Sequence, residues 1–76
     1  MNIYTVGSRN GIKELNWSCI ELSIERVIEL RQRHDYFDWF DATTNTSRYA
    51  IFSVHDAYEF WFEDGRKAIE FALRFQ

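Results

Sequence analysis

Two stretches of the chain carry apolar residues at the three- and four-residue spacing of an amphipathic helix. The first begins after Ser23, a favourable N-cap, and predicts a helix over about 24–34. The second begins after Asp64, also a favourable N-cap, and predicts a helix over 65–75. In this second helix we expect the inward-facing residues to be Ala68, Ile69, Ala72, Leu73 and Phe75.

Three other stretches are rich in aromatic and β-branched residues, a composition that is typical of strands. These predicted strands cover residues 36–42, 47–54 and 57–62. The connections between them are short and polar, and the second is the tight corner His55-Asp56. Short connections join antiparallel neighbours, so we expect a three-stranded antiparallel meander over 36–62.

The N-terminal third of the chain is less regular. Residues 2–6 predict a further strand, and Asn10-Gly11 favours a hairpin turn because both residues tolerate a positive φ. A second extended piece lies somewhere within 12–22, unless a capping box at Ser18 starts the first helix early. Both alternatives remain open at the level of the sequence.

Together these elements predict an α+β fold, in which a small antiparallel sheet carries two helices on one face. The chain has 76 residues, which suffices for a single domain over 1–76 and no more. Large rings fall on both faces of the predicted strands. Either the segment 7–22 covers the second face, or some of these rings stay exposed and bind a partner.

Composition excludes several kinds of site. One cysteine and two histidines cannot form an internal disulfide or a zinc framework, so we expect neither a metal nor a cofactor. No signal peptide and no apolar run of about 18 residues is visible, which predicts a soluble, cytoplasmic protein without membrane contact.

Groups suited to catalysis are sparse. Cys19 with His34 or His55 is the one conceivable thiol pair, and a lone cysteine among apolar residues is more often a small buried side chain. We expect His34 to end the first helix, where its charge suits the dipole. Asp38 and Asp41 lie three positions apart, which on a strand places them on opposite faces and prevents them from sharing a proton. We therefore expect no enzymatic activity.

Charge is unevenly distributed along the chain. Residues 35–64 carry seven acidic residues and one arginine, a net charge of −6, whereas residues 1–34 carry +1 and residues 65–76 carry +2. The basic helices either neutralise the acidic strands within the molecule, or the acids form an outward face for a basic partner. Linear charge segregation does not choose between these two interpretations.

The acidic and aromatic residues of the predicted strands are the candidates for such a face. The carboxylates would steer association and pair with Lys or Arg of a partner, while the rings would supply buried contact area. The candidate partner-binding residues are Asp35, Tyr36, Asp38, Trp39, Asp41, Tyr58, Glu59 and Trp61.

Two alternative functions fit the same pattern. Aromatic rings on a sheet can stack the bases of a single-stranded nucleic acid, although the net charge of −6 on these strands opposes direct nucleic-acid binding. Spare aromatic residues can also pair across a two-fold axis and make the protein a structural homodimer.

The C-terminal segment, a capping acid and then an amphipathic helix that ends in residues 71–76 (FALRFQ), resembles the ends of small phage-encoded accessory proteins. In size and acidity the chain resembles phage-encoded anti-host inhibitors, including anti-CRISPR proteins. The resemblance implies a non-enzymatic, stoichiometric blocker of a host nucleoprotein complex in the host cytoplasm. No motif defines this group, so the resemblance assigns no functional residue.

Overall fold

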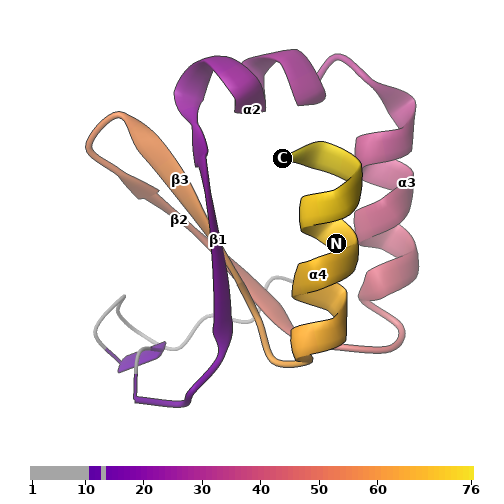
Figure 1. The fold of residues 1–76 in the computed structure, drawn as a ribbon. Coiled ribbons are helices and arrows are strands. Elements are labelled where there is room, and N and C mark those ends of the chain that lie inside the picture. The colour runs from indigo at the N-terminus through magenta and orange to yellow at the C-terminus, as the bar shows by residue number, and fades with distance from the viewer. Residues whose placement is uncertain (1–10, 13) are drawn as a thin grey trace.

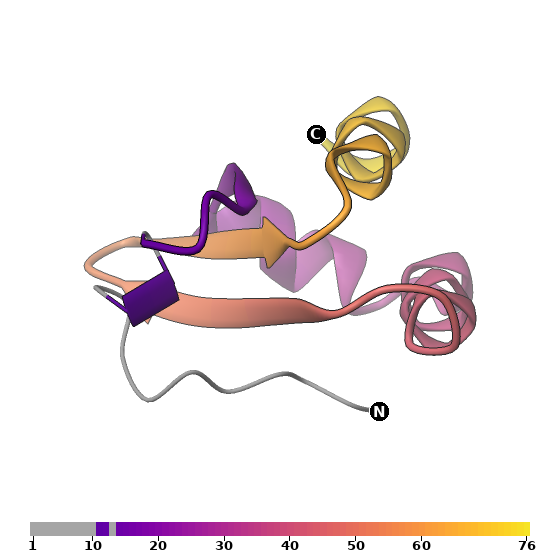
Figure 2. The ribbon, with the colours of Figure 1, turned by 90° about the horizontal axis from the view of Figure 1, so that it is seen from below.

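The computed structural model describes residues 11–12 and 14–76, and these form an open sheet with helices packed beside it (Figure 1). The strands are β1 (Ser18–Ser23), β2 (Tyr49–Val54) and β3 (Ala57–Phe62), and the helices are α2 (Ile24–Leu30), α3 (His34–Thr43) and α4 (Gly65–Phe75). The predicted α+β class is therefore confirmed. Figures 1 and 2 show α3 and α4 running alongside each other, and α2 crosses between the end of β1 and the start of α3.

The sheet has the strand order β1-β3-β2, and both pairs are antiparallel. The predicted hairpin between β2 and β3 is confirmed, and its corner residue His55 has a φ of 42°. In the sheet register Ile20, Phe60 and Ile51 stand side by side in one row. Directly paired residues of antiparallel strands point to the same face, so this row and its alternate neighbours define the face under the helices.

The two faces of the sheet carry separate apolar clusters. The larger cluster joins the helices to one face and includes the fully buried rings of Phe60, Phe62 and Phe71. The smaller cluster lies on the opposite face, where Ile12 and Trp17 pack with residues of β2 and β3. Ile12 and Trp17 therefore cover part of the second face, which explains why β3 carries large rings on both sides.

The prediction of a strand over 36–42 is wrong, because this segment lies within the helix α3. The residues Tyr36, Trp39, Phe40 and Thr43 are buried, and their spacing of three, four and seven positions is that of one helix face. Aromatic residues favour strands only where a pleated sheet offers them packing partners. Here the helical period prevails, and the third strand of the sheet is β1, most of which lies in the open region 12–22.

The remaining boundaries agree in part with the prediction. Ser23 caps α2 as expected, since its Oγ accepts a hydrogen bond from the backbone N–H of Arg26 at 3.2 Å, but the helix ends at Leu30 and not at residue 34. Helix α4 has the predicted bounds, and its cap Asp64 accepts from the N–H of Arg66 at 2.9 Å. The predicted strand over 2–6 and most of the hairpin turn before residue 12 lie outside the described residues.

The inward face predicted for α4 is wrong at two positions. Ile69 and Leu73 are 62% and 83% exposed, whereas Phe71, which the prediction omitted, is fully buried together with Phe75. The rings of Phe71 and Phe75 fill the space against the sheet and α3, so the aliphatic residues at the other angular positions of α4 remain outside.

Candidate interaction surface

Helix α3 carries a row of three exposed aspartates on the side that faces away from the core. Asp35, Asp38 and Asp41 are spaced three positions apart, so on a helix they follow one another along the same face, about 4.5 Å apart along the axis. We call these three residues the acidic face of α3. The expectation that Asp38 and Asp41 point to opposite sides was tied to the strand prediction and is wrong with it.

The buried side of α3 holds this face in a fixed position. Trp39 packs edge-on against Phe62 and Phe75, and its indole Nε1 donates a hydrogen bond of 2.6 Å to Oε1 of Glu70 on α4. This bond lowers the pKa of Glu70. Because large rings and a charge-assisted hydrogen bond join α3 to α4, the acidic face stands on a rigid support.

Five of the eight predicted partner-binding residues do not join the acidic face. Tyr36, Trp39 and Trp61 are at most 8% exposed and serve as core residues, so they cannot anchor a partner through their rings. Tyr58 is half-buried on β3. Glu59 is 5% exposed on the opposite face of the sheet, where its Oε1 accepts from Nε1 of Trp61 at 3.1 Å.

Ion pairs within the molecule neutralise part of the acidic middle segment. Arg33 binds Asp35 through both oxygens, with the shorter contact at 2.6 Å, and this lowers the pKa of Asp35. Glu63 pairs with Arg48 in the same way, and Asp64 pairs with Arg66. The interpretation that the charges are neutralised within the molecule is therefore confirmed in part, and the outward face for a basic partner stays a prediction.

Asp38 and Asp41 are the acidic residues of α3 that take no part in these ion pairs. Within the described part of the chain neither carboxylate forms an ion pair with a Lys or Arg side chain. Asp41 also lies in the last turn of α3, where the negative end of the helix dipole disfavours a carboxylate. The two charges thus oppose the stability of the helix that carries them.

Phe37 adds an apolar group to the rim of the acidic face. Its side chain is 42% exposed, and its ring contacts the buried Tyr36 at a centroid distance of 5.2 Å. Sequence reasoning missed Phe37, because the strand prediction placed emphasis on Tyr36 and Trp39. A helical projection of residues 34–43 would have found it, since it separates Phe37 and the aspartates from the other rings.

The residues considered for catalysis stand on different elements of the fold. Cys19 is exposed on β1, contrary to the expectation of a buried side chain. His34 begins α3 and does not end a helix, so it stands at the positive end of the dipole. Among residues 11–12 and 14–76 no group of three metal-binding side chains is found.

Comparisons of the chain with protein-family models, with curated proteins and with solved structures gave no significant match. In the part of the chain that the structure describes, every helix is too short or too polar to cross a lipid bilayer.

Proposed function

We propose that the protein is a non-enzymatic inhibitor or adaptor that binds a basic surface on another protein through the acidic face of α3. The observation that carries this proposal is the row of Asp35, Asp38 and Asp41 on the outer side of one well-supported helix. The resemblance to phage-encoded anti-host inhibitors suggests the class of partner, a host nucleic-acid-binding complex of the kind that anti-CRISPR proteins block.

The mechanism follows from the spacing and exposure of these carboxylates. The unpaired charges of Asp38 and Asp41, about one helical turn apart, offer a basic groove two regularly spaced anions beside the Arg33-bound Asp35, and these compete with nucleic-acid phosphates for the same Lys and Arg side chains. Exposed charges act mainly on the rate of association, so binding should weaken as salt screens the interaction over about 10 Å at 0.1 M ionic strength. Phe37 supplies apolar contact beside the charges.

Asp38 and Asp41 also support the proposal, because their charges are unfavourable for the fold. Carboxylates three positions apart repel each other by a few tenths of a kcal/mol on a helix surface, and Asp41 meets the dipole unfavourably. Residues that disfavour the fold are frequently retained for function. Nucleic-acid stacking finds less support, because Trp61, Trp39 and Tyr36 are buried.

The direct test compares charge reversals on and off α3. The double variant Asp38→Lys/Asp41→Lys should lose the protein that wild type retains from a bacterial lysate, and should associate with the isolated partner at least tenfold more slowly at low salt. The matched control is Glu21→Lys/Glu25→Lys, which changes the net charge equally at exposed positions of β1 and α2. If both double variants retain the partner equally, the acidic face is not the binding site.

A second candidate function, a structural homodimer, is favoured by one observation on α4. Ile69 and Leu73 lie four positions apart on the same helix face, and both are exposed. A two-fold contact between these residues of two copies would cover them. Sedimentation analysis over a range of concentrations tests this, since Leu73→Lys should then shift the protein to a monomer, and a wild-type protein that is monomeric throughout excludes it.

A further inference from the structure

A cavity of about 150 Å³ opens between α2, the first turn of α3 and the middle of β2 and β3, apart from the acidic face. Its apolar wall is formed by Val27, Ile51 and Phe60. Its other lining residues are Arg31, Tyr36 and Tyr58, whose side chains end in polar groups. An apolar pocket with a few convergent polar groups is the typical form of a small-molecule site.

Tyr36 lines this cavity with a largely buried ring. Its side chain is only 5% exposed and its ring packs against Phe40 and Phe75, yet no hydrogen bond joins its hydroxyl to another described residue. Burial raises the pKa of Tyr36 to about 12, so the hydroxyl remains protonated at neutral pH and can donate. Among the described residues the buried side-chain polar atom without a partner is Oη of Tyr49, so the Tyr36 hydroxyl is not sealed from solvent and can donate to a molecule that enters the cavity.

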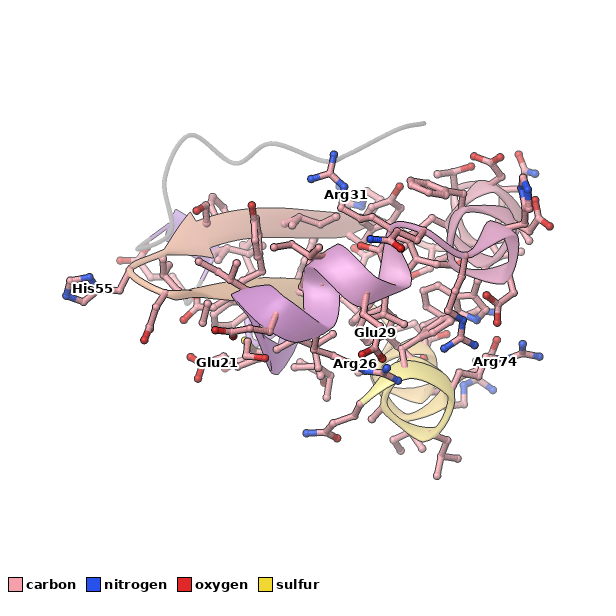
Figure 3. All side chains as sticks on the ribbon, turned by 90° about the horizontal axis from the view of Figure 1, so that it is seen from above. Glu21, Arg26, Glu29, Arg31, His55 and Arg74 are labelled. Atoms are coloured by element: carbon pink, nitrogen blue, oxygen red, sulfur yellow. The ribbon has the colours of Figure 1, made fainter. Side chains whose placement is uncertain are left out.

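Arg31 supplies a positive charge at the same cavity. Unlike the arginines of the ion pairs described above, it contacts no carboxylate among the described residues. Figure 3 shows Arg31 reaching outward from the end of α2, while Arg26 and Glu29 lie on the side of that helix nearer α4. Its charge opposes the effect of burial on the pKa of Tyr36.

We propose that this cavity binds a small monocarboxylate whose apolar body is about the size of a benzene ring. An apolar cavity of about 150 Å³ accommodates benzene, which sets the size of the body. The apolar part would lie on Val27, Ile51 and Phe60, and the carboxylate would accept hydrogen bonds from the Tyr36 hydroxyl and the Arg31 guanidinium. Arginine and carboxylate are geometrically matched for such a pair.

Benzoate is the probe that tests the proposal. Benzamide is the control without the charge, and acetate is the control without the ring. In a ¹⁵N-labelled sample, benzoate should produce saturable shifts centred on Val27, Tyr36 and Ile51, with a Kd on the order of 1 mM. Benzamide and acetate should each bind about tenfold more weakly, because one lacks the charge and the other lacks the ring. Shifts that never saturate, or equal shifts from all three probes, overturn the proposal.

Variants then assign the contacts. Arg31→Gln and Tyr36→Phe, which keeps the buried ring, should each weaken benzoate binding about fivefold to tenfold. Arg74→Gln is the control, because it removes the same charge from an exposed position on α4, well apart from Arg31 in Figure 3. Asp38→Lys/Asp41→Lys should still bind benzoate, which separates this site from the acidic face. Equal losses from Arg31→Gln and Arg74→Gln would mean that benzoate senses only net charge.

Discussion

Helices α3 and α4 lie side by side and bury the same kind of side chain, yet their outer faces differ. Inward, α3 contributes Trp39 and Phe40, and α4 contributes Phe71, whose ring lies 5.4 Å and 5.6 Å from theirs. Outward, α3 presents a row of aspartates, whereas α4 presents Ile69 and Leu73. The aromatic residues of both helices fill the core, and core packing does not determine which residues stand on the outer faces.

In both helices the prediction from the sequence was wrong about aromatic residues. In α3 the rings looked like strand residues because they are frequent and adjacent. In α4 the helix was correctly predicted, but aliphatic residues were placed inside in preference to a phenylalanine. In both cases the relevant quantity is the volume that a ring fills between two helices and a sheet, and this volume depends on all three elements.

The largest expected difference is between truncating a buried residue of α4 and truncating an exposed one. Phe71→Ala should lower the free energy of unfolding by about 3–5 kcal/mol, because it leaves a cavity between both helices and the sheet. Leu73→Ala should change it by less than about 0.5 kcal/mol, since that side chain is 83% exposed. Urea denaturation monitored by tryptophan fluorescence measures both. Similar losses from the two variants would contradict the burial pattern of α4.

A smaller effect is expected from the polar link between the helices. Trp39→Phe keeps a ring in the core but removes the hydrogen bond to Glu70, and should cost about 1 kcal/mol at neutral pH because Glu70 is half-exposed.

The same link predicts a dependence on pH. Since the bond lowers the pKa of Glu70 in the folded state, its contribution is complete above the pKa of the unfolded state and disappears as the pH falls through the lower, folded value. Glu70→Gln should therefore differ from wild type at pH 7 and converge with it under acidic conditions. A difference in stability that stays constant down to pH 2 would contradict this assignment.

The smallest effect is expected on the outer side of α3. Asp41→Asn should stabilise the protein by about 0.3–1 kcal/mol, because it removes a negative charge from the negative end of the helix dipole. Asp35→Asn should have the opposite sign, since Asp35 lies in the first turn and pairs with Arg33. Thermal denaturation at low salt compares the two, and a loss of stability in Asp41→Asn would show that this carboxylate has a structural role.

Local signals in the sequence predicted the elements that depend on contacts between residues close together in the chain. Ser23 and Asp64 mark helix starts because their side-chain oxygens accept from nearby backbone N–H groups, a contact within three residues. The hairpin of β2 and β3 was likewise predicted from its short corner. The aspartates of the candidate surface were predicted for a face of the sheet, and they stand on the outer side of α3.

The non-local arrangement could not be predicted in the same way. Tyr36 and Trp39 were expected to contact a partner, but they lie in the core. The helix at this position presents their rings to α4 and presents Phe37 to the outside. The cavity lined by Arg31 and Tyr36 lies between two helices and two strands that are separate in the chain. Its existence depends on how those elements meet.

The amino-acid sequence by itself determined the α+β class, the helix caps, the β2–β3 hairpin and the acidity of the middle segment, since these depend on propensities and contacts within a few residues. Only the tertiary structure decided which strand pairs with β3 on its other side, which rings are buried, and that the aspartates stand on a helix. The physical reason is that an aromatic residue fits a strand or a helix equally well until neighbouring elements enclose it, and enclosure is a property of the whole packed chain.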